Sequence, residues 1–405
     1  MGDTHIGASN FKLDQRHKDF LRVFEEAIDI CIDLKVDFVI HSGDLFDTGR
    51  PSFKELIFVI EQLKKLKENN IPFLTVAGSH DVYIHETPLS LLEKIGLLTN
   101  LSNPRYLVPK GDVVLLNGAS IKNTFIAGVP GFKGNVKEKY SMIKPNIPNN
   151  VFSIFIFHHI ISDVEDAGSF ADLPLSSLPK GFDYYAGGHW HRKNIFEYNK
   201  KPVVYPGSTE YTDSLDMLKS KEKGMFLVEV PEEKTKKLKL KWIKLNAREV
   251  VFKEIELNNL TPIEATNKLF KEIPKHGRDS ILILKLKGRI NGLKSQINFN
   301  RVLKESEING FIYCKLFLSE LSDEAGEEYQ EIKNKTIKEI EYEFLKKQKY
   351  DDVTIKLAQE LINLLGKEQT PKELILNQEE CIKMIDKLFL NKELNDFMKS
   401  KEGVK

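Results

Sequence analysis

Five short segments of this chain carry aspartate and histidine in patterns that suit metal binding. They are Asp3-Thr4-His5, Gly43-Asp44, Gly78-Ser79-His80-Asp81, His158, and Gly188-His189-Trp190-His191. Residues two apart at the end of a strand point to the same side, so Asp3 and His5 can direct two ligands at one point. The pair His189 and His191 can do the same. Carboxylate and imidazole ligands without a thiolate suit Mn²⁺, iron or Zn²⁺.

Each segment also has a simpler interpretation. Asp3 and His5 can be a chance pair, and Gly43-Asp44 favours a turn for conformational reasons alone. His158 can be a half-buried core residue. The order and spacing of the five segments, each beside a predicted strand end, make coincidence a poor explanation.

The elements that must position these residues follow an α/β pattern over roughly the first 230 residues. Apolar runs predict strands at 36–40, 72–76, 152–157 and 183–186. Asp14 can cap a first helix, and Pro51 suits the first turn of a second. Ligand sites in open α/β sheets lie at the carboxyl ends of strands, where the polar segments fall.

The pattern changes after about residue 225. Strands are predicted at 237–242, 250–255, 281–286 and 311–317, with a helix at 261–271, which together indicate a small α+β domain. Helices are predicted at 327–347, 353–365 and 378–388. We therefore expect three domains, at 1–230, 231–322 and 323–405.

The composition is that of a folded protein without a disulfide framework. The chain has 405 residues, of which 41% are hydrophobic and 29% charged. Cys31, Cys314 and Cys381 are far apart and form no CxxC pair, and neither a secretory signal nor a membrane-length apolar run is present. We therefore expect a reducing, cytoplasmic location. Its formal charge is +1, so any DNA binding must come from a local basic surface.

Taken in order, the five segments resemble the motifs of the calcineurin-like metallophosphoesterases. The resemblance is closer to the DNA double-strand-break repair nucleases of the Mre-eleven type, called SbcD in bacteria, and suggests an archaeal member. The resemblance to this narrower group rests on residues that flank the five segments: Ile6-Gly7, Leu45-Phe46, Arg50-Pro51-Ser52, Tyr184-Tyr185-Ala186 and Tyr205-Pro206-Gly207-Ser208. These motifs cover about residues 1 to 210.

The resemblance implies a metallophosphoesterase sandwich of two mixed β-sheets flanked by helices at 1–230. It also implies a DNA-capping domain at 231–322 and a helical segment for an ATPase partner at 323–405. A two-metal site is expected, with Mn²⁺ as the metal. The first ion would be held by Asp3, His5, Asp44 and His191, and the second by Asp44, Ser79, His158 and His189. His80 would act on the scissile phosphate, and Asp81 would support His80.

The implied reaction is Mn²⁺-dependent hydrolysis of DNA, as a 3′-to-5′ exonuclease on double strands and an endonuclease on single strands. The implied partners are DNA ends and a coiled-coil ABC-type ATPase of the Rad-fifty or SbcC kind, and the implied location in the cell is the nucleoid. A second copy of the chain would be joined through helices at 53–67 and 88–98. Arg50, Arg192 and Lys193 flank the motifs and are candidate phosphate contacts. Two alternatives stay open: a catalytically weak scaffold that tethers the ATPase to DNA ends, and a phosphodiesterase for other substrates.

Two departures from the family pattern matter. The family carries asparagine where this chain has Ser79, whose hydroxyl is a shorter and weaker ligand. Only Met1 and Gly2 precede Asp3, where the family has an apolar strand, so we expect a missing strand or a start further upstream. The sequence does not decide whether Asp47 caps the following helix or belongs to the metal site.

Overall fold

The computed structural model describes residues 1–81, 87–131, 133–230 and 238–323, and six helical residues between 342 and 356. The chain divides into two units, Met1–Ser322 and Asp323–Lys405. The helices expected at 327–347, 353–365 and 378–388 lie outside the described residues, apart from five of those six. No helix in the described ranges is long and apolar enough to cross a membrane.

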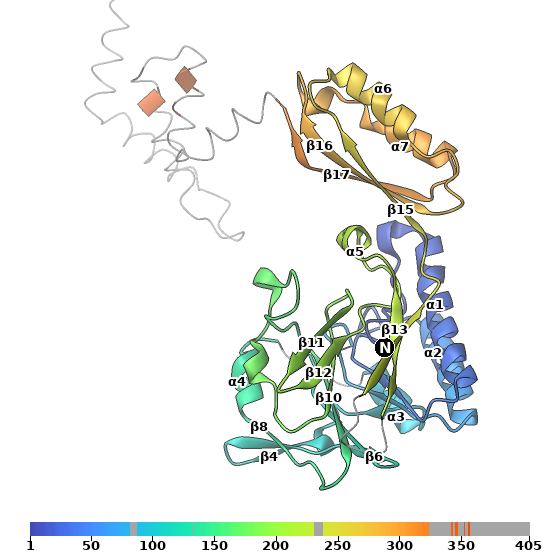
Figure 1. The fold of residues 1–405 in the computed structure, drawn as a ribbon, viewed down its shortest axis with the longest axis vertical. Helices are drawn as coiled ribbons and strands as arrows, with labels where there is room; N and C mark the ends of the chain where they lie inside the picture. The colour runs from blue at the N-terminus through green and yellow to red at the C-terminus, as the bar shows by residue number, and fades with distance from the viewer. Residues whose placement is uncertain are drawn as a thin grey trace, which may run out of the picture. The chain divides into compact units, whose positions relative to one another are not determined.

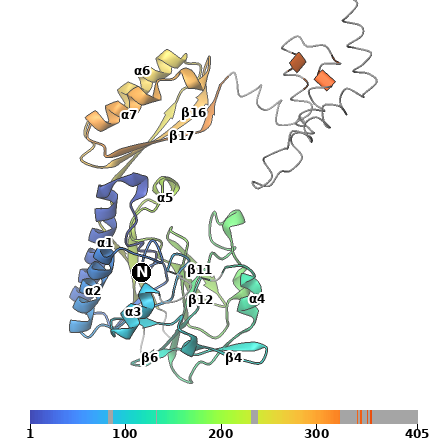
Figure 2. The same ribbon diagram turned by 180° about the vertical axis from the view of Figure 1, so that it is seen from behind.

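A parallel sheet covered by helices forms the first part of Met1–Ser322. Its strands are β1 (Val39–His41), β2 (Phe73–Thr75) and β3 (Thr99–Asn100). The helices are α1 (Asp14–Asp33), α2 (Phe53–Glu68) and α3 (Pro88–Lys94). α1 and α2 lie side by side in Figures 1 and 2 and bury an apolar stripe that includes Phe24 and Leu63.

The starts of these two helices differ in detail from the prediction. The residue before α1 is Leu13, which makes no capping bond, and Asp14 lies in the first turn. There its negative charge still faces the partly positive end of the helix. Pro51 lies outside α2 rather than in its first turn, because the N-cap of α2 is Ser52, which forms a reciprocal capping box with Glu55.

A six-stranded mixed sheet forms the second layer, in the order β11-β12-β10-β9-β7-β6. Its strands are β6 (Ala119–Ile121), β7 (Thr124–Gly128), β9 (Phe152–His158), β10 (Tyr184–Gly188), β11 (Asn194–Tyr198) and β12 (Lys201–Tyr205). The four inner strands pair in parallel, and β6 and β11 run antiparallel at the edges. Leu74 and Val76, from β2 and just after it, share a buried cluster with Ile154 and Ile156 of β9, so the two sheets form one sandwich.

Smaller elements surround this sandwich. They are β4 (Leu107–Lys110), β5 (Val113–Leu116), β8 (Ile143–Pro145), α4 (Val136–Ser141) and α5 (Ser214–Lys219). Short 3₁₀ turns occur at Asn10–Lys12, Pro104–Tyr106, Gly168–Phe170, Leu175–Ser177 and Lys294–Gln296.

A hairpin crosses the predicted domain boundary at residue 230. β13 (Gly224–Glu229) pairs antiparallel with β14 (Lys239–Lys244). The half-buried Leu238 and Leu240 pack on the cluster between the two sheets. The alternating strand near 237–242 therefore packs with the first domain, and the next sheet begins at β15.

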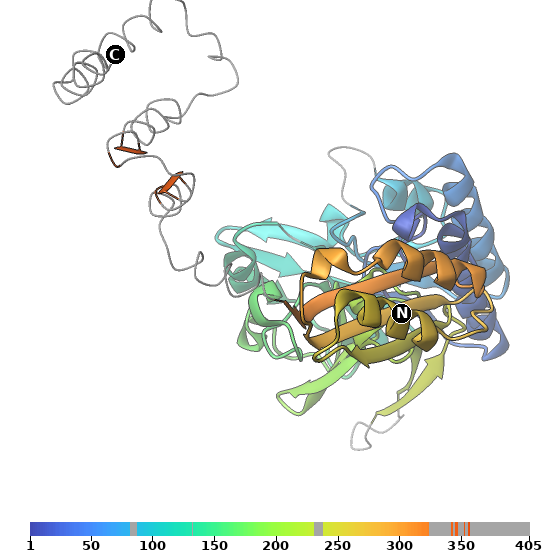
Figure 3. The same ribbon diagram turned by 90° about the horizontal axis from the view of Figure 1, so that it is seen from above.

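The small domain alternates strands and helices. Its elements are β15 (Val250–Glu256), α6 (Pro262–Glu272), β16 (Ile281–Arg289), α7 (Phe299–Ile308) and β17 (Tyr313–Ser322). All three strands pair in parallel, which requires a crossover helix after each of the first two strands. This is an α/β pattern, whereas the sequence predicted α+β because α7 was not foreseen. Both helices cover one face of the sheet (Figures 1 and 3).

Candidate metal centre

The aspartates and histidines of the five segments lie where strands of both sheets end. The first residues of the chain run beside the end of β1, where the Asp3 N–H donates to the Gly43 carbonyl at 2.9 Å. Asp44 follows β1, and His80 follows β2. His158 ends β9 and is paired with Gly188 at the end of β10. The sandwich therefore brings four strand ends to one place.

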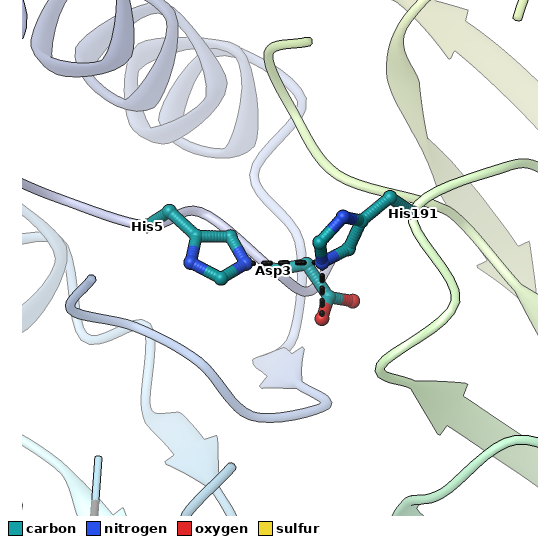
Figure 4. Close-up of side chains that lie close together, drawn as sticks. All are labelled: Asp3, His5 and His191. Atoms are coloured by element: carbon teal, nitrogen blue, oxygen red, sulfur yellow. Dashed lines mark hydrogen bonds and ion pairs between the residues drawn. The ribbon is translucent and has the colours of Figure 1, made fainter. Parts of the chain in front are cut away.

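These side chains form three overlapping groups whose possible ligand atoms lie within 4.8 Å of one another. The groups are Asp3, His5 and His191; Asp44, His158 and His189; and His5, Asp44 and His80. Figure 4 shows the first group, in which both imidazole rings converge above the Asp3 carboxylate. The first two groups contain six of the seven residues expected to hold metal. Ser79 lies beside them, with its hydroxyl donating to Asp44 Oδ2 at 3.3 Å.

In two histidine rings, Nδ1 contacts a group that can only accept a hydrogen bond. His158 Nδ1 lies 2.8 Å from the Ser42 carbonyl oxygen. His5 Nδ1 lies 3.2 Å from Asp47 Oδ1. Because a carbonyl and a carboxylate only accept, Nδ1 carries the proton in both rings. Each Nε2 is then free to offer its lone pair to a cation in the centre.

The remaining donor atoms fit a divalent cation. His5 Nε2 and His191 Nε2 lie 3.1 Å apart. Two imidazole nitrogens bound at about 2.1 Å to one zinc-sized ion lie on the order of 3 Å apart. Asp3 Oδ2 is buried without a hydrogen-bond partner among the described residues. Buried polar atoms are normally paired, so this unpaired oxygen indicates a missing ligand.

The backbone is strained at four of these positions. Asp3, His5, Asp44 and His189 have φ values of 51°, 43°, 55° and 77°. A non-glycine residue in this left-handed region is destabilised by roughly 1–3 kcal/mol, and such residues cluster at functional sites. The fold holds them there because neighbouring glycines allow close approach. A side chain at Gly43, for example, would collide with the His158 ring.

Without a cation, the buried charges of the centre perturb one another. Burial, together with the charge of Asp44, raises the pKa of Asp3 to about 6. Burial opposes protonation of His158, but the Asp44 carboxylate outweighs it and raises the pKa of His158 to about 9. Burial and the neighbouring His158 lower the pKa of His189 to about 4. Such coupled groups at strand ends are typical of a functional site.

Asp44 lies at the middle of the cluster. Its Oδ1 accepts the His80 backbone N–H at 2.8 Å, and its Oδ2 lies 3.0 Å from His158 Nε2 and 3.9 Å from His5 Nε2. One carboxylate therefore faces ligands of both metal groups. This placement suits the bridging role that the family resemblance implies.

His80 and Asp81 have different surroundings. The His80 side chain is 46% exposed, and its Nδ1 donates to the Asp47 carbonyl oxygen at 2.7 Å. Asp81 is fully buried and accepts the backbone N–H groups of Leu45, Phe46 and Gly78 at 3.0–3.2 Å. The residue that contacts the His80 ring is therefore Asp47, and Asp81 instead holds together the loops after β1 and β2.

Asp47 is the site residue that sequence reasoning left undecided. Its carboxylate contacts the His5 ring, and its carbonyl oxygen contacts the His80 ring. Ser52 caps α2, so the alternative role for Asp47 is already filled. Its position three residues after Asp44 suggested a site residue. An aspartate just before a predicted helix equally suggests a helix cap, so the sequence did not separate the two roles.

The three candidate phosphate contacts lie outside the ligand groups. Arg192 is ion-paired with Asp166 at 2.9 Å and lies over the Trp190 ring. Lys193 is ion-paired with Glu222 at 3.1 Å. Arg50 is exposed. A role in DNA binding for these three remains a prediction.

Similarity to known proteins agrees with this geometry. Residues 1–193 match the model of the calcineurin-like phosphoesterase family. The DNA double-strand break repair protein Mre11 of Methanocaldococcus jannaschii is 31% identical over 279 residues, which cover 66% of this chain and 72% of the relative. The chain belongs to the Mre11 family.

Two other Mre11 proteins show how far the similarity extends. The protein of Sulfolobus acidocaldarius is 29% identical, covering 72% of this chain and 74% of the relative. That of Sulfurisphaera tokodaii is 33% identical, covering 55% of this chain and 54% of the relative. The matched region thus spans about half of one Mre11 relative and about three quarters of the other.

Proposed function

We propose that this chain is a Mn²⁺-dependent DNA nuclease of double-strand-break repair. It would act as a 3′-to-5′ exonuclease on double strands and as an endonuclease on single strands. The observation that carries the proposal is the convergence of carboxylate oxygens and imidazole Nε2 atoms from four strand ends. The Mre11 relatives, which are named as DNA double-strand break repair proteins, support DNA as the substrate.

Two sets of residues would hold the cations. The first set is Asp3, His5, Asp44 and His191, and the second is Asp44, Ser79, His158 and His189. When bound, two divalent cations neutralise the phosphodiester charge and lower the pKa of the attacking water. The chain supplies the orientation of these ligands, because the groups behind His5 and His158 fix which ring nitrogen faces the centre.

His80 is the proposed catalytic residue. Its Nδ1–H is held by the Asp47 carbonyl, so its Nε2 is left to interact with the substrate. The ring is half exposed and lies 5.0 Å from the His5 ring, centroid to centroid. From this position, protonated His80 can stabilise charge on the phosphoryl oxygens or donate a proton to the leaving oxygen.

The other parts of the chain have proposed roles in assembly. We assign the two sheets with the β13–β14 hairpin to the nuclease domain and β15 to β17 with their helices to a DNA-capping domain, so the boundary lies between β14 and β15 rather than at residue 230. Residues 323–405 are assigned to binding of a coiled-coil ABC-type ATPase. Dimerisation through α2 and α3 is supported by large apolar side chains left exposed there. They are Phe53, Ile57, Leu91 and Ile95.

The direct test is cleavage of linear double-stranded and circular single-stranded DNA with Mn²⁺. We expect His80→Ala to lower the cleavage rate by about 10²–10⁴-fold, as for a lost general acid, while Mn²⁺ affinity is kept. His17→Ala, which changes a histidine on α1 outside the ligand groups, is the control and should cleave normally. Loss of Mn²⁺ binding in His80→Ala would show that His80 is a metal ligand.

One observation favours a second candidate function. Ser79 offers only a hydroxyl where the family has an amide oxygen, and that hydroxyl already donates to Asp44. If the second metal site is too weak to support cleavage, the protein would act instead as a scaffold that tethers the ATPase to DNA ends. Wild-type protein that binds DNA ends but cleaves neither substrate at any Mn²⁺ concentration would support this alternative.

A further inference from the structure

A chain of polar side chains extends from His191 away from the metal centre. Thr212 Oγ1 lies 2.6 Å from His191 Nδ1 and 3.4 Å from Asp216 Oδ2. Thr212 precedes α5, and Asp216 lies within its first turn. Asp216 is buried, so its contacts are made inside the protein.

A buried ammonium group balances the Asp216 carboxylate. Lys223 Nζ lies 2.6 Å from Asp216 and also donates to Ser208 Oγ and to the His191 carbonyl oxygen, both at 2.8 Å. The Lys223 side chain is only 2% exposed. Asp216 also accepts the Ser220 hydroxyl at 2.6 Å and the Thr212 backbone N–H at 3.1 Å. The carboxylate is therefore held in place by several donors.

The direction of the hydrogen bonds follows from these partners. A hydroxyl can donate one bond and accept others, but an ionised carboxylate can only accept. The Thr212 hydroxyl therefore donates to Asp216, and its oxygen accepts the Nδ1–H of His191. The Nδ1 atoms of His5 and His158 face groups that can only accept a hydrogen bond. The Nδ1 atom of His191 instead faces a hydroxyl that can donate or accept, so the position of the His191 proton depends on what else that hydroxyl contacts.

We infer that Thr212 is a positioning residue that fixes His191 with its proton on Nδ1 and its Nε2 free for a cation. Asp216 sets the direction of the Thr212 hydroxyl, and Lys223 holds Asp216. The opposite arrangement, with the hydroxyl donating to Nδ1, would place the proton on Nε2, where it would occupy the lone pair that a cation needs. The identity of the metal in this inference rests on the proposed function. The position of the proton on His191 does not.

The test compares three substitutions in the full chain. Thr212→Val removes the hydroxyl and keeps the shape, whereas Thr212→Ser keeps the hydroxyl. Thr209→Val is the matched control, because the Thr209 hydroxyl is buried in the same loop without a hydrogen-bond partner among the described residues. Mn²⁺ affinity is measured by titration calorimetry, and thermal melting shows whether each variant is folded.

We expect Thr212→Val to bind Mn²⁺ about 10–100-fold more weakly, the usual effect of losing the partner behind a metal-binding histidine. Thr212→Ser and Thr209→Val should bind like wild type. Equal affinity in Thr212→Val and Thr209→Val overturns the inference, and so does failure of Thr212→Ser to restore binding.

A measurement on the wild-type protein alone gives a second readout. Nitrogen-15 NMR of the imidazole groups without metal should show His191 with its proton on Nδ1. A proton on Nε2 overturns the inference even if no variant folds. Both readouts are independent of DNA cleavage, so an inactive wild-type protein would count against the proposed function and leave this inference standing.

Discussion

Ser79 is the residue at which the candidate metal centre differs from the motif that the family resemblance implies. Its hydroxyl reaches Asp44 Oδ2 at 3.3 Å, so it lies beside the proposed bridging carboxylate. An asparagine carbonyl at the same position would reach further and is a stronger oxygen ligand. We expect Ser79→Asn to tighten the second cation and raise cleavage at low Mn²⁺ by about tenfold, a typical scale for a single ligand contact.

A titration of cleavage rate against Mn²⁺ checks this for wild type, Ser79→Asn and Ser79→Ala. If the hydroxyl ligates weakly, Ser79→Ala should need more Mn²⁺ than wild type. Superimposable curves for all three proteins would mean that another group already completes the second site.

The convergence of these aspartates and histidines could be predicted from the sequence, but the residues that contact their far side could not. Aspartate and histidine at strand ends stand out, because few core positions tolerate them. Asp47 was ambiguous, because the same residue type caps helices. Thr212 gave no signal at all. The contact of the Thr212 hydroxyl with His191 is recognised only when the fold brings together the loop after β10 and the residue two positions before α5, 21 residues apart in the sequence.

At the level of elements, buried charges join α1 to the start of the small domain. Arg16 is fully buried and contacts Asp19 at 2.7 Å and Glu210 at 3.0 Å. Arg248, just before β15, donates to Asp19 Oδ2 at 2.8 Å. The loop that contains Glu210 thus lies between the proposed metal ligand His191 and the small domain.

Removing one partner from this network should be strongly destabilising. We expect Arg16→Met to lower the free energy of unfolding by about 3–5 kcal/mol, because buried carboxylates lose their counter-charge. Arg22→Met is the control on the same helix. Arg22 is 48% exposed and lies 3.7 Å from Asp19, so its loss should change stability by less than about 1 kcal/mol. Urea unfolding measures both, and equal effects would contradict this account of the network.

Element prediction succeeded where the apolar pattern was strong. The buried strands β9 and β10 and the helix α6 lie within a few residues of their predicted ranges. The pairing of β14 with β13 was missed, because a strand's own alternation does not say which sheet it joins. α7 was missed because its polar residues weaken the helical pattern, and without it the parallel order of the small sheet could not be inferred.

For the whole molecule, the exposed apolar side chains of α2 predict a dimer. Phe53 is 84% exposed and Ile57 is 54% exposed. In a protein–protein interface, truncating one of the few dominant buried side chains costs about 2 kcal/mol or more of binding free energy. We expect the wild-type protein to sediment as a dimer and the double variant Phe53→Glu, Ile57→Glu to sediment as a monomer.

Phe252→Glu is the matched control, because Phe252 is 50% exposed on β15 of the small domain. It should leave the dimer intact. A wild-type monomer at micromolar concentration, or a double variant that stays dimeric, would show that α2 is not the interface.

The central claim is that strand ends of the two sheets build one centre for two cations. Anomalous diffraction from crystals of the full chain grown with Mn²⁺ tests it most directly. The account predicts two peaks about 3.5–4 Å apart, the usual spacing of a two-metal hydrolytic site. One peak should lie among Asp3, His5 and His191, and the other among Asp44, His158 and His189. The account is contradicted by a centre without a peak while Mn²⁺ is bound elsewhere, or by a single peak coordinated by neither group.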